Sequence, residues 1–168
     1  AVRLKAEDIV EPILIGDQDE ISQLANEKKW NLEGIAIICP DQYDQMDEMI
    51  EAFVDRRKGK NTREEAVEML KDPAYFGTML VYQDLADGMV CGAVYSTGDT
   101  VRPALQIIKT RPNVKLISGA FIMVPPHTNG QKLVFADCAI NINPDAQSLA
   151  EIAVESAKTA KMFGIDPK

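Results

Sequence analysis

The stretch from residue 87 to residue 106 constrains the fold of this chain more than any other part. Its first section, residues 88–94, is a short apolar run with two glycines and no charged residue, and it follows an Asp-Gly turn signal. Such a run is typical of a strand buried on both faces, as in a parallel sheet. A hydroxyl-rich loop follows at residues 96–100, and apolar residues then recur with helical spacing over residues 101–109. The stretch therefore predicts a strand, a loop and a helix in direct succession.

This loop is predicted to lie where a ligand can bind. Open α/β sheets bind ligands at the carboxyl ends of their strands, and a helix N-terminus there favours an anion. We expect Thr100 or Asp99 to be the N-cap, which places Pro103 in the first turn, where its missing N–H costs little. The unit would therefore present free backbone N–H groups to a negatively charged group.

Side chains of the same loop add hydrogen-bond donors. Ser96, Thr97 and Thr100 each carry a hydroxyl, and the Arg102 guanidinium can hold a phosphoryl group through two parallel hydrogen bonds. These residues predict a site for a small phosphate or an acyl phosphate. The alternative is that the hydroxyls only cap the helix and that Arg102 is solvated. An arginine in the first turn lies at the unfavourable end of the helix dipole, which favours the anion site.

The same stretch resembles the signature of the phosphate acetyltransferase (phosphotransacetylase) family. That signature reads Asp-Gly-x-Val-Ser-Gly-Ala and then His-Ser-Thr/Ser-x-Asp-Thr-x-Arg-Pro-Ala, and residues 87–104 follow it closely. Two positions depart from it, Cys91 where serine is common and Tyr95 where histidine is common, so any role of an imidazole at residue 95 is lost. Further matches cover most of the remaining chain, at residues 52–60, 72–79, 133–143 and 152–167.

The resemblance implies a fold and an activity. The implied fold is α/β, the two-lobed architecture of isocitrate/isopropylmalate dehydrogenase-like proteins, with the active site in the interlobe cleft. Residues 1–111 would form the first lobe, which carries the phosphate loop, and residues 112–168 the start of the second, a hairpin and a helix. The implied reaction is reversible acetyl transfer between acetyl phosphate and coenzyme A, giving acetyl-CoA and phosphate, in a homodimer with no prosthetic group.

The resemblance also assigns roles to residues. Arg102 would anchor the departing phosphate together with Ser96, Thr97 and Thr100. Arg57 aligns with an arginine proposed to contact substrate, in a pattern like Arg-Lys-x-Lys, so both arginines are candidate catalytic residues. For the basic run at residues 56–60, the alternative is a solvated helix end whose charge suits the dipole.

The chain is expected to be a fragment of such an enzyme. It begins inside a helical pattern without the strand that opens the family, and it stops where the family continues into its next strand. A later family stretch like Asn-Asp-Leu-Ser-Arg-Gly completes the site and is not found here, so no general base is assigned. We therefore expect residues 1–168 alone to be inactive.

Two other functions stay open at this point. One is phosphate butyryltransferase, which carries out the same chemistry on a longer acyl chain. The other is a catalytically silent module of the same fold that binds acyl-CoA and regulates a partner, as in the C-terminal region of some malic enzymes. The signature residues Ser96, Asp99, Thr100 and Arg102 are intact, which argues against a silent module.

Charge and composition exclude several classes of protein. The net charge of −8 makes broad binding to nucleic acid or to an anionic membrane improbable, since both need a basic surface. No apolar run is long enough to span a membrane and no signal-peptide pattern opens the chain, so a cytoplasmic location is expected. Cys39, Cys91 and Cys138 lack metal-ligand spacing, so no metal is expected, and they are predicted to be reduced and buried rather than reactive.

The remaining elements follow from local patterns. Short strands are predicted at residues 10–15 and 35–39, and a hairpin of two strands at residues 116–124 and 133–142. Helices are predicted over residues 44–58, after a capping box that starts at Thr62, and after the caps Asp72 and Asp145. Tyr75 is expected in the core rather than in a base-stacking platform. Asp137, inside an apolar run, needs a partner, either to support a site or to tie down a loop.

Overall fold

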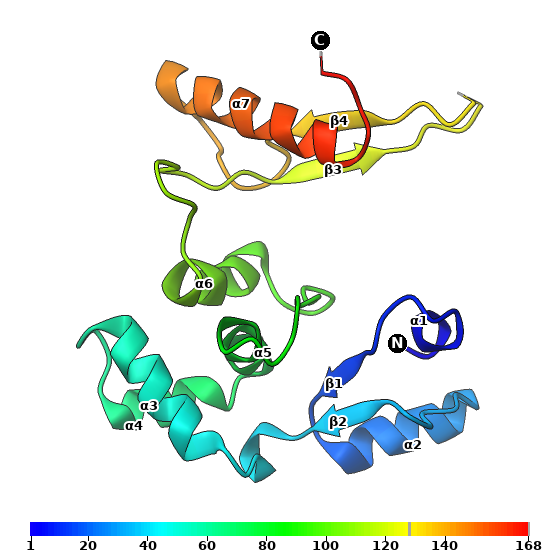
Figure 1. The fold of residues 1–168 in the computed structure, drawn as a ribbon, viewed down its shortest axis with the longest axis vertical. Helices are drawn as coiled ribbons and strands as arrows, with labels where there is room; N and C mark the ends of the chain where they lie inside the picture. The colour runs from blue at the N-terminus through cyan, green and yellow to red at the C-terminus, as the bar shows by residue number, and fades with distance from the viewer. Residues whose placement is uncertain (128, 168) are drawn as a thin grey trace. The chain divides into compact units, whose positions relative to one another are not determined.

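The structure is a computed structural model that describes residues 1–127 and 129–167, and the chain divides into two compact units between residues 108 and 109. Both units mix helices with small sheets (Figure 1). The first unit contains, in chain order, α1 (Val2–Ala6), β1 (Ile13–Ile15), α2 (Gln18–Lys28), β2 (Ala36–Ile38), the 3-10 turn η1 (Pro40–Gln42), α3 (Met46–Arg57), α4 (Arg63–Leu70), α5 (Pro73–Tyr82) and α6 (Thr97–Ile107). The second contains β3 (Ala120–Met123), β4 (Leu133–Ala136) and α7 (Ala146–Met162).

The first sheet consists of β1 and β2, which run parallel. Ile13 pairs with Ala36 and Ile15 with Ile38, so the register is continuous over both strands. Parallel strands need a crossover connection, which α2 supplies. The Asp17 carboxylate accepts a hydrogen bond of 2.9 Å from the backbone N–H of Glu20 and thereby begins α2. Both predicted strands are confirmed, although each is shorter than its apolar run.

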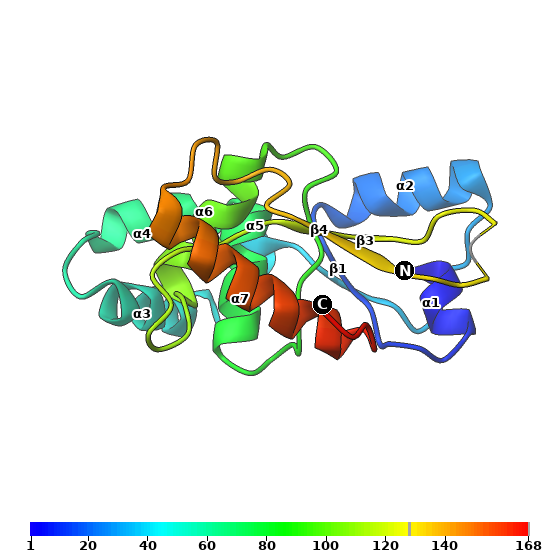
Figure 2. The same ribbon diagram turned by 90° about the horizontal axis from the view of Figure 1, so that it is seen from above.

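The core of the first unit lies among α3, α4, α5 and α6. Figure 1 and Figure 2 show these four helices grouped together, and Ile15 of β1 and Ile38 of β2 pack against their buried cluster. Along α3, Met49, Ile50 and Phe53 are buried, which is the centre of the stripe that the sequence predicts for this helix. Six further side chains from α4, α5 and α6 are buried in the same cluster and close the core: Ala66, Leu70, Phe76, Met79, Leu80 and Ile107.

Side-chain caps determine where the central helices begin. The Thr62 hydroxyl accepts a hydrogen bond from the N–H of Glu65, and the Glu65 carboxylate accepts one from the N–H of Thr62, which confirms the capping box of α4. Asp72 caps α5 and Pro73 is its first residue, where a proline lacks no needed donor. These starts are local features, and the structure has each of them as predicted.

The predicted strand at residues 88–94 is wrong for the described chain. This segment is irregular, and Val90 and Val94 are almost completely exposed. A strand is stable only when a neighbouring strand takes its backbone hydrogen bonds. The described sheet of this unit ends at β1 and β2 and provides no such neighbour. Cys91, expected to be buried, is exposed for the same reason, whereas Cys39 and Cys138 are partly buried.

The second unit is a hairpin with one helix beside it. In the antiparallel pair β3 and β4, Phe121 lies opposite Phe135 and Met123 opposite Leu133. Helix α7 begins at its cap Asp145 and packs on β4. The hairpin is confirmed, but its strands are shorter than predicted.

Asp137 ends β4 and organises the turn that follows. Its carboxylate accepts hydrogen bonds from the N–H groups of Ala139, Ile140 and Asn141 at 2.8, 2.9 and 2.9 Å. Partial burial raises the pKa of this carboxyl, but the backbone donors at Ile140 and Ala139 outweigh burial and hold the pKa well below its usual range. Asp137 therefore ties down a loop, which settles the alternative that the sequence leaves open.

Candidate functional site

Helix α6 begins one turn earlier than the sequence predicts. Ser96, not Thr100 or Asp99, is the N-cap: its hydroxyl accepts from the N–H of Asp99 at 3.2 Å and donates to the Asp99 carboxylate at 2.7 Å. The reason is a Ser-x-x-Asp spacing, which allows a reciprocal cap with an acidic residue in the first turn. Pro103 consequently lies inside the helix rather than in its first turn, and its ring is buried in the core.

Three polar residues lie along one face of α6, near the buried Pro103. Asp99, Arg102 and Gln106 are separated by three and four positions, which places them on neighbouring turns of one helix face. Arg102 forms an ion pair of 3.2 Å with Asp99, and both side chains are about half exposed. The guanidinium is thus held at the helix start while one side of it faces solvent.

Thr100 contributes a buried hydroxyl. Its Oγ1 atom is inaccessible to solvent and has no hydrogen-bond partner among the described residues. Gly92 lies beside it, with φ at +106°, and a Cβ placed there would come within 3.5 Å of the Thr100 hydroxyl. Because a buried hydroxyl without a partner is unfavourable, Thr100 can gain a hydrogen bond when a ligand enters this loop. Thr97, the first residue of α6, is exposed.

The structure places both candidate arginines near one tyrosine. Arg57, in the last turn of α3, donates through Nε to Asn61 Oδ1 at 2.7 Å and through Nη1 to the carbonyl of Gln106 at 3.5 Å. The Tyr75 hydroxyl donates to Gln106 Oε1 at 3.0 Å. Burial raises the pKa of Tyr75, and the positive charges of Arg102 and Arg57 oppose that rise. The negative charges of Asp72 and Asp99 add to the rise, so charges of both signs act on this hydroxyl.

Tyr95 attaches the loop before α6 to the start of α5. Its hydroxyl donates to Asp72 Oδ2 at 3.3 Å, while Asp72 Oδ1 accepts from the N–H of Ala74 at 2.8 Å. Burial raises the pKa of Tyr95, and the Asp72 carboxylate raises it further. Tyr95 thus supplies a neutral hydroxyl for anchoring the loop, at the position where the family commonly has an imidazole.

Sequence reasoning missed two residues of this site. Tyr75, expected in the core, is only partly buried and bonds to Gln106, and Gln106 was assigned no role. A usable signal for Gln106 is its position one turn after Arg102 on the same helix. For Tyr75 the sequence offers no such signal, because its partner is 31 positions away.

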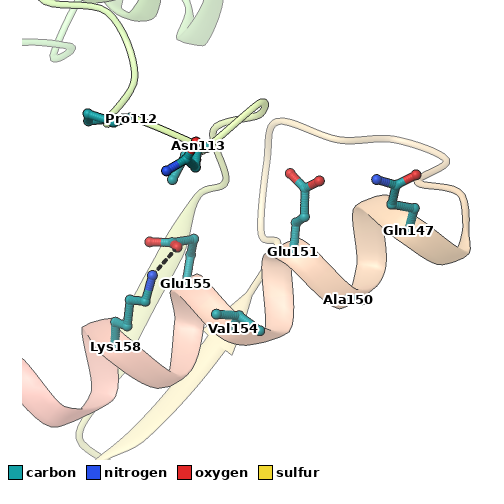
Figure 3. A pocket seen from close by; sticks show the side chains of 9 residues that line it. Pro112, Asn113, Gln147, Ala150, Glu151, Val154, Glu155 and Lys158 are labelled. Carbon is teal, nitrogen blue, oxygen red and sulfur yellow. Dashed lines mark hydrogen bonds and ion pairs between the residues drawn. The ribbon is translucent and has the colours of Figure 1, made fainter.

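A cavity lies in the second unit, apart from the residues of the candidate site, and has the wrong charge for a phosphate. The cavity, of about 520 Å³, lies between residues 112–114 and one face of α7. Figure 3 shows Glu155 paired with Lys158, and their atoms are 2.6 Å apart. Glu151 also lines it, and its Oε2 atom is buried without a hydrogen-bond partner among the described residues. Two carboxylates against one ammonium make this cavity a poor anion site.

Two further properties concern residues 1–127 and 129–167 as a whole. Within these ranges no three His, Cys, Asp or Glu side chains are grouped so that they could hold a metal ion. None of the helices in the same ranges combines the length and the apolar character needed to cross a membrane.

Taken together, these features define a protein of mixed helices and small sheets that has a candidate anion site at the N-terminus of α6, beside Arg102, while Arg57 contacts the C-terminal part of the same helix. A sequence model described as phosphate acetyl/butaryl transferase matches residues 1–168. The phosphate acetyltransferase of Bacillus subtilis is 55% identical over 166 residues, which are 99% of this chain and 50% of that protein. The chain therefore belongs to the phosphate acetyl/butaryl transferase family.

Other relatives agree with this assignment. The phosphate acetyltransferase of Staphylococcus epidermidis is 54% identical over the whole of this chain and 50% of its own length. A phosphotransacetylase from Streptococcus pyogenes has a TM-score of 0.92 at 54% identity, and covers 100% of this chain and 51% of its own. The EutD phosphotransacetylase from Staphylococcus aureus has a TM-score of 0.89 at 51% identity, and covers 99% and 50%. The chain thus spans about half the length of the relatives that it matches.

Proposed function

We propose that the protein containing this chain is a phosphate acetyltransferase, which transfers an acetyl group reversibly between acetyl phosphate and coenzyme A. The observation that carries the proposal is the approach of Arg57 to α6, the helix of Arg102, in a chain 55% identical to a phosphate acetyltransferase. Coenzyme A is a substrate here, and no prosthetic group is part of the proposal. The products of the forward reaction are acetyl-CoA and phosphate.

The reaction makes three demands, and residues of this chain can meet the first. The thiolate of coenzyme A attacks the acetyl carbon to form the C–S bond, and the C–O bond to phosphate breaks, so that phosphate leaves with the electron pair. The leaving phosphate needs an anchor, the carbonyl oxygen needs charge stabilisation, and the thiol needs a base. Arg102, Thr97 and Thr100 are proposed as the anchor. Ser96 can join them by exchanging its bond to Asp99.

Arg57 has a second role in this proposal. It lies near Gln106 and can share the phosphate charge or place coenzyme A. The base is expected in the half of the relatives that this chain does not match. We further propose the two-lobed isocitrate/isopropylmalate dehydrogenase-like fold, with residues 1–111 in the first lobe and residues 112–168 at the start of the second. A cytoplasmic homodimer completes the proposal.

The direct test uses the protein expressed from its complete reading frame. Formation of the thioester from acetyl phosphate and coenzyme A is followed by absorbance, and the same assay is run with butyryl phosphate. Higher kcat/KM for acetyl phosphate supports the proposal, and higher kcat/KM for butyryl phosphate would make the protein a phosphate butyryltransferase. Binding of acetyl-CoA without turnover of either acyl phosphate would identify a silent regulatory module instead.

Residues 1–168 alone are expected to lack this activity. A phosphate anchor without a general base forgoes a factor of roughly 10²–10⁴ in rate, and an incomplete cleft positions the two substrates poorly. The measurement compares mass-verified residues 1–168 with the complete protein under identical conditions. Activity of the shorter chain within about tenfold of the complete protein would contradict the argument.

A further inference from the structure

We infer that Tyr75 and Gln106 are positioning residues that fix the spacing between the helices of Arg57 and Arg102 when these arginines bind an anion. The inference rests on the proposed function, because the anion is taken to be the phosphoryl group of the acyl phosphate. Neither residue is assigned to the chemistry itself. Their role is to set the spacing between α3, which carries Arg57, and α6, which carries Arg102.

Gln106 contacts Arg57 and lies on the same helix as Arg102. It lies one helical turn after Arg102, and its main-chain carbonyl accepts a hydrogen bond from Arg57 Nη1 at 3.5 Å. Its side-chain oxygen accepts from the Tyr75 hydroxyl at 3.0 Å, within the usual range for this type of bond. Gln106 therefore bonds to Tyr75 through its side chain and to Arg57 through its main chain.

The ring of Tyr75 is held by a contact with the hydrophobic core. Its ring meets the ring of Phe53 edge to face, with centroids 6.2 Å apart and an interplanar angle of 77°. Phe53 is completely buried and lies one helical turn before Arg57 on α3. Tyr75 thus contacts α3 through its ring and α6 through its hydroxyl. Tyr75, a residue of α5, thereby links the two helices that carry Arg57 and Arg102.

A neutral hydroxyl suits this position better than a carboxylate would. A carboxylate between two guanidinium groups would pair with them and compete with an incoming anion. Burial raises the pKa of Tyr75, so the phenol stays protonated near neutral pH and adds no negative charge to the Asp99 carboxylate that already pairs with Arg102. The Arg57 guanidinium is also fixed on its other side, where Nε donates to Asn61.

The test removes only the hydroxyl, with Tyr75→Phe in the complete protein, so that the ring contact with Phe53 is kept. The chain offers a matched control in Tyr43→Phe. Tyr43 also meets a buried ring edge to face, that of Phe76 at 5.1 Å, and its hydroxyl also bonds to a glutamine, Gln45 at 3.1 Å. This second glutamine lies outside the candidate site, in the short segment before α3.

Two quantities are measured for both variants, the dissociation constant of inorganic phosphate by calorimetry and the KM of each substrate. Tyr75→Phe should raise the phosphate constant and the KM for acetyl phosphate by about three- to tenfold, the loss of one hydrogen bond, and leave the KM for coenzyme A unchanged. Tyr43→Phe should change none of them. Gln106→Leu should match Tyr75→Phe, and the double variant should be no worse than the worse single variant.

Several results would overturn the inference. One is equal phosphate binding by Tyr75→Phe and Tyr43→Phe, and another is independent, additive effects of the Tyr75 and Gln106 substitutions. Absence of phosphate binding by the unsubstituted protein would overturn both proposals. If the complete protein binds phosphate but transfers no acetyl group, only the proposed function fails, and weakened phosphate binding by Tyr75→Phe still supports the positioning role.

Discussion

Replacement of Arg102 by alanine should lower the catalytic rate strongly and leave the free energy of unfolding almost unchanged. The guanidinium pairs with Asp99 at 3.2 Å, but both side chains are about half exposed, so the pair is screened by water. An exposed pair at this helical spacing contributes about 0.5 kcal/mol or less to the free energy of unfolding. Arg102→Ala should therefore fold normally and unfold at nearly the same urea concentration as the unsubstituted protein.

The expected effect on the reaction is much larger. If Arg102 holds the phosphoryl group as its charge develops, its loss raises the barrier by about 2–4 kcal/mol, which lowers the rate by roughly 30- to 1,000-fold. Arg102→Lys should recover only part of this, because an ammonium cannot make two parallel hydrogen bonds. Arg57→Ala should lower the rate less than Arg102→Ala, since Arg57 is proposed only to share or support the binding of the phosphate.

The assay is kcat/KM for acetyl phosphate at saturating coenzyme A, on the protein from its complete reading frame. Arg63→Ala is the control, because Arg63 is also a half-exposed arginine in ion pairs, with Asp47 and Glu51, on a helix away from the site. The control should retain normal kinetics. A value for Arg102→Ala within about threefold of the unsubstituted protein would refute the assignment, as would an equal loss in Arg63→Ala.

Two further predictions concern stability. Thr62→Ala removes the reciprocal cap of α4 and should lower the free energy of unfolding by about 1 kcal/mol, measured by urea denaturation; an unchanged midpoint would mean that the Glu65 carboxylate alone suffices. Because the pKa of Asp137 is lower in the folded chain than in the unfolded one, its stabilisation is complete above the unfolded pKa of about 3.9 and is lost as pH falls below it. The protection factor of the Ile140 amide, its hydrogen-exchange rate corrected for the intrinsic rate at each pH, should fall in that acidic window, and Asp137→Asn should lose this dependence; a protection factor that stays constant with pH in the unsubstituted protein would contradict the assignment.

Features that depend on near neighbours could be predicted from the sequence. The capping box at Thr62, the Asp72-Pro73 start of α5 and the Asp145 start of α7 each need only residues within one helical turn. The apolar stripe of α3 is equally local, because the helical period alone decides which residues share a face. The signature at residues 87–104 pointed to the family that the comparisons then showed.

The segment at residues 88–94 shows where local reasoning stops. Its apolar, uncharged run has the composition of a buried strand, yet Val90 and Val94 are exposed because no described strand lies beside them. Strand formation depends on a partner that the segment itself cannot specify. The predicted start of α6 is wrong by one helical turn. Several consecutive residues here can cap a helix, and only the hydrogen bonds in the structure identify Ser96 as the cap.

The sequence by itself therefore determined helices, the caps at Thr62, Asp72 and Asp145, the family and the identity of the charged groups. Only the tertiary structure decided which of those groups lie together. Arg57 and Gln106 are 49 positions apart, and Tyr75 and Gln106 are 31 positions apart. These contacts exist because α3, α5 and α6 bury their apolar faces in one core. The packing of that core sets the angles and the relative positions of the helices, and thereby decides which polar side chains come within reach of one another.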